Sequence, residues 1–161
     1  MACAVILMGS KADLPSVEQI AAALGGWGIR HEQRVASAHK SAQHLLDLLA
    51  EYEAGGQVGV YITVAGRSNA LSGVVDANVS APVIACPPYS DRFGGADLYS
   101  SLRVPSGVAP AVVLEPAGAA LLAAKILALG DPDLRERIGQ VQREQTEALL
   151  AADREVKGSC E

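Results

Sequence analysis

Short strand-like runs alternate with longer segments of helical periodicity along most of this chain. The strand-like runs cover residues 4–8, 31–36, 58–64, 82–85 and 111–114, and the helical segments cover residues 14–24, 42–52, 68–79 and 117–129. A run that is apolar throughout, such as 4–8, is typical of a strand that is covered on both faces of a sheet. The alternation therefore predicts an α/β fold of three layers, in which helices pack on both faces of a parallel sheet.

The length of the chain, 161 residues, fits one domain that spans residues 1–161. Half of the residues are hydrophobic, which is enough for a substantial core. The last segment, 130–161, is predicted to be a charged C-terminal helix with an apolar stripe and few partners elsewhere in the chain. The stripe consists of Leu134, Ile138, Val141, Leu149 and Leu150. This helix packs either on its own domain or partly against another subunit, and the sequence leaves both possibilities open.

The charge and composition of the chain argue against several classes of partner. A net charge of −5 gives no long-range attraction for nucleic acid or an anionic membrane, and aromatic residues, at 4%, are scarce for base stacking. No window approaches the ~20 apolar residues of a membrane span, and residues 2–8 are interpreted as a first strand, not a signal peptide. We therefore expect a cytoplasmic protein that binds neither nucleic acid nor membrane.

The three cysteines, Cys3, Cys86 and Cys160, are widely spaced and form no CxxC pair. Their number and spacing exclude a self-contained disulfide framework and a zinc-ribbon pattern. No other cluster with metal-ligand spacing is visible, so no metal is predicted. Cys86 lies beside Pro87 inside an apolar run, and we therefore expect its thiol to be buried.

The carboxyl ends of parallel strands meet at one edge of a sheet, which is where α/β folds bind ligands. The segment Gly9-Ser10-Lys11-Ala12-Asp13 follows the first predicted strand at this edge. Gly9 allows the backbone to turn closely, Ser10 offers a hydroxyl, and free N–H groups at a helix start can bind a phosphate. The segment matches neither the P-loop nor the GxGxxG pattern. Asp13 fits two roles, as an N-cap of the next helix or as a ligand of ribose hydroxyls.

The segment Ser37-Ala38-His39-Lys40 lies between the second predicted strand and its helix. Histidine exchanges protons near neutral pH, so His39 is the candidate for proton transfer. Lys40 is the candidate for neutralising an anion such as a phosphate. The alternative is a solvated loop in which both side chains are incidental.

A third loop is predicted at the same edge, and a further loop precedes the fifth predicted strand. The third loop, 65–73, contains Gly66, Arg67, Ser68 and Asn69. The small residues of this loop suit a helix start, and Arg67 and Asn69 add hydrogen-bond donors. Arg67 has the alternatives of a solvated charge or an intersubunit ion pair. The further loop, 100–107, is polar and is either a substrate lid or a plain connector. Convergence of three loops on one edge favours a real site.

These residues resemble those of a known family, the phosphoribosylaminoimidazole carboxylases of purine biosynthesis, which have a flavodoxin-like (Rossmann-type) fold. The resemblance runs from Met8 through the loop 37–40 to the helix at 121–127. The chain is similar to the second class, which carboxylates its ribonucleotide directly with CO2, in residues 65–69, 85–88 and 100–107. The first class, a mutase, has a Gly-Gly-Ala-Ala-His run after the third strand, and Ala70 stands where that histidine would be.

The resemblance also implies a role for each loop. It assigns His39 to proton transfer and the remaining residues to binding of the ribonucleotide. The substrate phosphate is assigned to Ser10 and Lys40 with Ser37 nearby, the ribose hydroxyls to Asp13, and the neighbourhood of the imidazole and of CO2 to Gly66, Arg67, Ser68 and Asn69. Gly9 belongs to the same binding loop as Ser10. Ala12 replaces a serine that is common in this loop, which removes one hydroxyl.

The activity that the resemblance implies is that of a carboxy-lyase. It carboxylates 5-aminoimidazole ribonucleotide (AIR) reversibly with CO2 to 4-carboxy-5-aminoimidazole ribonucleotide (CAIR), without ATP or a cofactor. A homo-oligomer, a tetramer or octamer with pockets at subunit interfaces, is expected. The alternatives are the mutase, which acts on N5-carboxyaminoimidazole ribonucleotide, and a non-catalytic nucleotide-binding module. A flavin mononucleotide protein is a third, and the scarcity of aromatic residues counts against it.

Overall fold

Five parallel strands form the central sheet in a computed structural model that describes residues 2–158. The strands are β1 (Cys3–Met8), β2 (His31–Val35), β3 (Val58–Val64), β4 (Val83–Ala85) and β5 (Ala111–Val112). They are arranged in the order β2-β1-β3-β4-β5. β1 therefore lies between β2 and β3, and β4 and β5 follow on the far side of β3. The predicted parallel sheet is confirmed, and β1, β2 and β3 are adjacent at its carboxyl edge.

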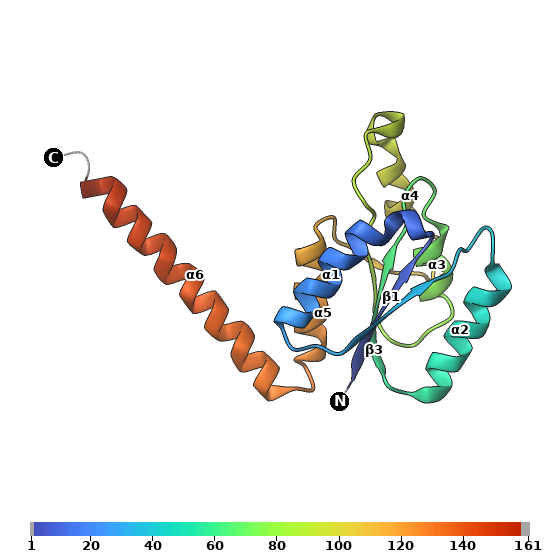
Figure 1. The fold of residues 1–161 in the computed structure, drawn as a ribbon, viewed down its shortest axis with the longest axis horizontal. Coiled ribbons are helices and arrows are strands. Elements are labelled where there is room, and N and C mark those ends of the chain that lie inside the picture. The colour runs from blue at the N-terminus through green and yellow to red at the C-terminus, as the bar shows by residue number, and fades with distance from the viewer. Residues whose placement is uncertain (1, 159–161) are drawn as a thin grey trace.

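Helices cover both faces of the sheet, as the sequence predicts (Figure 1). One face is covered by α1 (Leu14–Gly26) and α5 (Pro116–Leu127), and the other by α2 (Ala42–Gly55) and α3 (Ala70–Asp76). Successive side chains of β1 point to opposite faces, so that Ile6 joins the core under α1 and α5 while Leu7 joins the core under α2 and α3. Both side chains are fully buried.

Close packing of α5 on the sheet depends on a glycine in β3. A Cβ at Gly59 would lie 2.5 Å from Cδ2 of Leu127 and 2.9 Å from Cβ of Ala2. A side chain at position 59 would therefore require the Leu127 side chain and Ala2 to shift.

Three short elements connect the strands and the longer helices. They are the 3₁₀ turns η1 (Lys11–Asp13) and η2 (Arg92–Leu98) and the single helical turn α4 (Tyr99–Leu102). η1 lies between β1 and α1 in the chain, and η2 and α4 lie between β4 and β5. The η2–α4 segment projects past the sheet in Figure 1. Its backbone bends sharply, because Phe93, Gly94 and Gly95 are all in the left-handed region.

The last helix, α6 (Pro132–Gly158), extends away from the layered body for most of its length (Figure 1). Leu134 and Ile138 at its start are buried in the core beside α1 and α5. Farther along, Leu149 and Leu150 are 72% and 53% exposed. The predicted apolar stripe is thus buried on its own domain at its first two positions, half-buried at Val141 and exposed at its last two. None of the helices between residues 2 and 158 combines the length and the apolar composition that a membrane span requires.

Candidate functional site

A cleft of about 480 Å³ opens at the carboxyl edge of the sheet, between the loops that follow β1, β2 and β3. Nine of the ten residues predicted for the site line it, and Asn69 does not. The nine are Gly9, Ser10, Asp13, Ser37, His39, Lys40, Gly66, Arg67 and Ser68. Because β2, β1 and β3 are neighbours in the sheet, their loops meet at this edge although they are far apart in the sequence.

The β1 loop is closed by a carboxylate that accepts two hydrogen bonds. Oδ2 of Asp13 accepts from the backbone N–H of Ser10 at 2.9 Å and from the Ser10 hydroxyl at 3.1 Å. The amide of Asp13 donates to the Ser10 carbonyl at 3.1 Å. Asp13 stands at the N-cap position of α1, but its side chain makes no capping hydrogen bond to that helix and instead closes the preceding loop through Ser10. Its half-buried side chain also lines the cleft.

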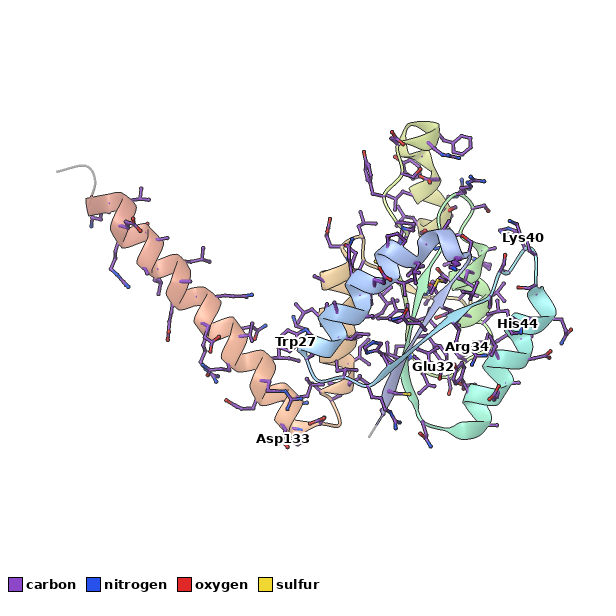
Figure 2. The ribbon with its side chains drawn as sticks, in the orientation of Figure 1. Trp27, Glu32, Arg34, Lys40, His44 and Asp133 are labelled. Atoms are coloured by element: carbon purple, nitrogen blue, oxygen red, sulfur yellow. The ribbon has the colours of Figure 1, made fainter. Side chains whose placement is uncertain are left out.

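The β2 loop presents His39 and Lys40 on a turn that two serines hold. Oγ of Ser41 accepts from the amide of Ser37 at 2.9 Å, and Oγ of Ser37 accepts from the amide of Lys40 at 3.2 Å. The side chains of His39 and Lys40 are exposed at the cleft. Figure 2 shows Lys40 on the loop between β2 and α2, while His44 lies on α2 itself. The imidazole of His39 and the ammonium group of Lys40 are therefore both accessible to a ligand.

The β3 loop has an unusual backbone at its centre. Arg67 adopts φ +59°, in the left-handed region that residues with a side chain rarely occupy. Its amide donates to Oδ2 of Asp97 at 3.3 Å, and its carbonyl accepts from the Ser100 hydroxyl at 3.0 Å. The conformation directs the exposed Arg67 and Ser68 along the cleft, next to the half-buried Gly66.

Asn69 is the predicted site residue that the structure places elsewhere. Its side chain is 6% exposed and caps α3: Oδ1 accepts from the amide of Ser72 at 3.2 Å and from its hydroxyl at 2.9 Å. Nδ2 donates to Oγ of Ser101 at 3.0 Å. Asn69 borders a second, more open hollow of about 660 Å³, together with Tyr99 and Arg103. Asparagine is a preferred N-cap residue. The sequence analysis placed the start of the helix at residue 68, so Asn69 fell inside the predicted helix and its capping role was missed.

Several residues around the site were not among the predicted site residues. Ala12, Ala38, Ala65 and Leu71 also line the cleft, and they contribute shape without polar chemistry. Asp97 and Ser100 contact the backbone of the β3 loop from about thirty positions away in sequence. Ser100 begins the polar segment 100–107 that was predicted to be a lid or a connector. Contacts of this kind depend on the folded path of the chain.

No group of three or more His, Cys, Asp or Glu side chains within residues 2–158 is arranged to hold a metal ion. The prediction of a buried Cys86 is confirmed, since the residue is 1% exposed. Burial raises the pKa of its thiol to about 11, with a smaller contribution from the charge of Glu115. The thiol of Cys86 is therefore protonated at neutral pH and is not an activated nucleophile.

The sequence model of one family, AIR carboxylase, matches residues 3–148. The chain belongs to the AIR carboxylase family. The family predicted from the loop residues is thereby confirmed, and the match includes all three loops of the cleft. It also covers the first part of α6, which begins at Pro132.

Individual members of the AIR carboxylase family are similar over nearly the whole chain. A phosphoribosylaminoimidazole carboxylase of Archaeoglobus fulgidus is 54% identical over 154 residues, which are 96% of this chain and 84% of that protein. A phosphoribosylaminoimidazole carboxylase of Treponema denticola is 49% identical over 153 residues, which are 95% of this chain and 96% of that protein. The crystal structure of Treponema denticola PurE superposes with a TM-score of 0.92 at 48% identity, covering 95% of this chain and 97% of that one. The predicted flavodoxin-like fold is confirmed.

Proposed function

We propose that this protein carboxylates AIR with CO2 to give CAIR, reversibly and without ATP. The observation that carries the proposal is the cleft in which Ser10, His39 and Lys40 come together, in a chain half identical to proteins named phosphoribosylaminoimidazole carboxylase. A cleft of about 480 Å³ is within the size range of sites for small-molecule ligands.

The chemistry asks little of the protein beyond position and one proton acceptor. C4 of the aminoimidazole is an enamine-type carbon, so its π electrons form the new bond to the carbon of CO2, and a carboxylate develops on the CO2 oxygens. The proton on C4 then leaves to His39, and the electrons of the C4–H bond restore the aromatic ring. His39 later releases this proton to water. Positioning supplies up to ~7–11 kcal/mol in the most favourable cases, and acid–base help adds ~10²–10⁴-fold.

The loops divide the binding of AIR between them. Lys40 holds the phosphate, with Ser10 and Ser37 beside it, and Asp13 accepts hydrogen bonds from the ribose hydroxyls. Gly66 and Ser68 leave room for CO2 over the ring, and the Arg67 guanidinium stabilises the developing carboxylate. Support comes from the shared cleft and from the exposure of Lys40 and Arg67.

Asn69 takes a different part from the one the family resemblance implied. Its amide is committed to Ser72 and Ser101. We assign it to holding the loop that carries Arg67 and Ser68.

The second candidate function is the mutase reaction on N5-carboxyaminoimidazole ribonucleotide. Two observations favour the carboxylase: Ala70 stands where the mutase class has a histidine, and the relatives of highest identity reported above bear the name of the carboxylase. A non-catalytic nucleotide-binding module would use the same phosphate and ribose contacts. It would have no need of an exposed histidine at the cleft.

We assign the protein to the cytoplasm and to a homo-oligomer, a tetramer or an octamer, in a single domain of residues 1–161. The assembly is supported by the exposed apolar side chains of α6, Leu149, Leu150 and Val156, which no other part of residues 2–158 covers. An apolar stripe of this length is stabilised when another subunit packs on it.

The test supplies the purified protein, without ATP, either with AIR and ¹³C-labelled CO2 or with N5-carboxyaminoimidazole ribonucleotide. Formation of CAIR that carries ¹³C in its carboxylate, from AIR alone, is the expected result. Turnover of the N5-carboxylated compound alone would establish the mutase instead. Binding of AIR that stabilises the protein, with turnover of neither compound, would establish the binding module.

A further inference from the structure

The loop that carries Arg67 and Ser68 into the cleft is fixed by residues behind it. The η2–α4 segment, residues 92–102, packs against this loop through Asp97, Ser100 and Ser101. Its contacts are made to backbone atoms and to the buried side chain of Asn69. Arg67 and Ser68 themselves remain exposed toward the cleft.

Ser100 is the centre of these contacts. Its Oγ lies 3.0 Å from the carbonyl oxygen of Arg67 and accepts from the amide of Asn69 at 2.9 Å. The same Oγ lies 2.7 Å from the carbonyl oxygen of Asp97. One hydroxyl proton serves the two carbonyl oxygens, while a lone pair serves the amide. The hydroxyl thus joins the two peptide groups that flank Ser68 and sets the direction in which Ser68 points.

The left-handed backbone of Arg67 needs this support. A residue with a Cβ at φ +59° is held there by its surroundings, not by its own preference. Two hydrogen bonds hold it: the Arg67 amide donates to Oδ2 of Asp97, and the Arg67 carbonyl accepts from the Ser100 hydroxyl. Without them, Arg67 would relax toward the common α or β region and carry Ser68 with it.

The support is anchored in the core of the protein. Oγ of Ser101 accepts from Asn69, whose Oδ1 accepts from Ser72. The Ser72 hydroxyl lies 2.8 Å from Oγ1 of Thr63, which is buried in β3. This buried chain of hydrogen bonds fixes α4, and with it Ser100, relative to the sheet.

We propose that Ser100 is a positioning residue that holds the Arg67–Ser68 loop in the geometry required for carboxylation, and that Asp97 assists it. The inference rests on the proposed function. Ser100 acts through the loop and does not line the cleft, so its loss should affect turnover more than binding. The phosphate and ribose contacts belong to Ser10, Asp13 and Lys40, which the η2–α4 segment does not hold.

The test compares Ser100→Ala, Ser100→Thr and Asp97→Ala with the wild type. In Ser100→Ala, kcat falls about tenfold or more because the reacting groups are misaligned, while the Kd of AIR stays within about threefold. In Ser100→Thr a hydroxyl is restored at the same position, so most of kcat returns. Ser106→Ala, a change of an exposed serine in the same polar segment, is the matched control and keeps wild-type kcat.

Other results overturn the inference. Wild-type kcat in both Ser100→Ala and Asp97→Ala would remove the positioning role, as would equal losses of kcat in Ser100→Ala and Ser100→Thr. If Ser100→Ala does not fold, Asp97→Ala carries the test by the same split of kcat and Kd. Absence of turnover in the wild type would instead contradict the proposed function, so the two failures are distinguishable.

Discussion

Oδ2 of Asp13 accepts both polar hydrogens of Ser10, the amide at 2.9 Å and the hydroxyl at 3.1 Å. This pair closes the loop after β1 and fixes the orientation of the Ser10 hydroxyl. It also gives one carboxylate two tasks, since Oδ2 stabilises the loop while the side chain faces the cleft. The consequences of changing Asp13 therefore separate into an effect on stability and an effect on binding.

Substitution of Asp13 should separate these two tasks. In Asp13→Asn an amide oxygen still accepts from Ser10, so the melting temperature changes little. The charged acceptor for the ribose hydroxyls is lost, and KM for AIR rises about tenfold, the scale of one hydrogen bond to a charged group. Asp13→Ala loses both tasks and lowers the melting temperature as well. Steady-state kinetics and thermal unfolding measure the two effects.

A matched control for Asp13 is available on α2. Asp47 is exposed and accepts from Nε2 of Gln43 at 2.8 Å, outside the cleft. Asp47→Asn should leave KM unchanged. An unchanged KM in Asp13→Asn as well would contradict the assignment of Asp13 to the ribose.

Replacement of His39 should abolish turnover and spare binding. In His39→Asn no group remains to accept the C4 proton, and kcat falls by ~10²–10⁴-fold. The Kd of AIR, measured by titration calorimetry, changes little because the phosphate and ribose contacts persist. His44→Asn is the control, since His44 is exposed on α2 and does not line the cleft. Near-normal kcat in His39→Asn would show that another group takes the proton.

The sequence predicted the parts of the site that follow from topology. Parallel strands force the loops after β1, β2 and β3 to one edge, so Ser10, His39 and Gly66 could be brought together from their positions after strand-like runs. The conformation of Arg67 could not, because its partner Asp97 is thirty residues away and is placed by the fold. The tight contact at Gly59 likewise depends on how α5 lies on β3.

A carboxylate at the other end of the sheet should make stability depend on pH. Glu53 accepts from the Tyr61 hydroxyl at 3.1 Å and from the amide and hydroxyl of Ser80 at 3.0 and 2.8 Å. Burial alone would raise the pKa of Glu53, but these hydrogen bonds favour the charged form and together leave its pKa lowered. The charged carboxylate therefore stabilises the folded state above the ordinary glutamate pKa. This stabilisation is lost as the pH falls through the lowered value.

Glu53→Gln tests this dependence. Its free energy of unfolding at pH 7 should be lower than that of the wild type by about 1 kcal/mol, a value discounted for partial exposure. The difference should shrink as the pH falls below the ordinary glutamate range. Denaturant unfolding at several pH values measures it. A difference that stays constant from pH 7 to pH 3 would contradict the role of the charge.

The exposed end of α6 should govern assembly. Leu149 and Leu150 are largely exposed, although the start of the same helix is buried through Leu134 and Ile138. In Leu149→Glu/Leu150→Glu two charges replace the apolar surface, and burying them between subunits without partners is unfavourable. The expected result is a smaller assembly in analytical ultracentrifugation, with the fold of the body unchanged. Ala148→Glu/Ala151→Glu adds the same charges on the opposite side of the helix and should keep the wild-type assembly. If both variants assemble like the wild type, the subunits associate without this stripe.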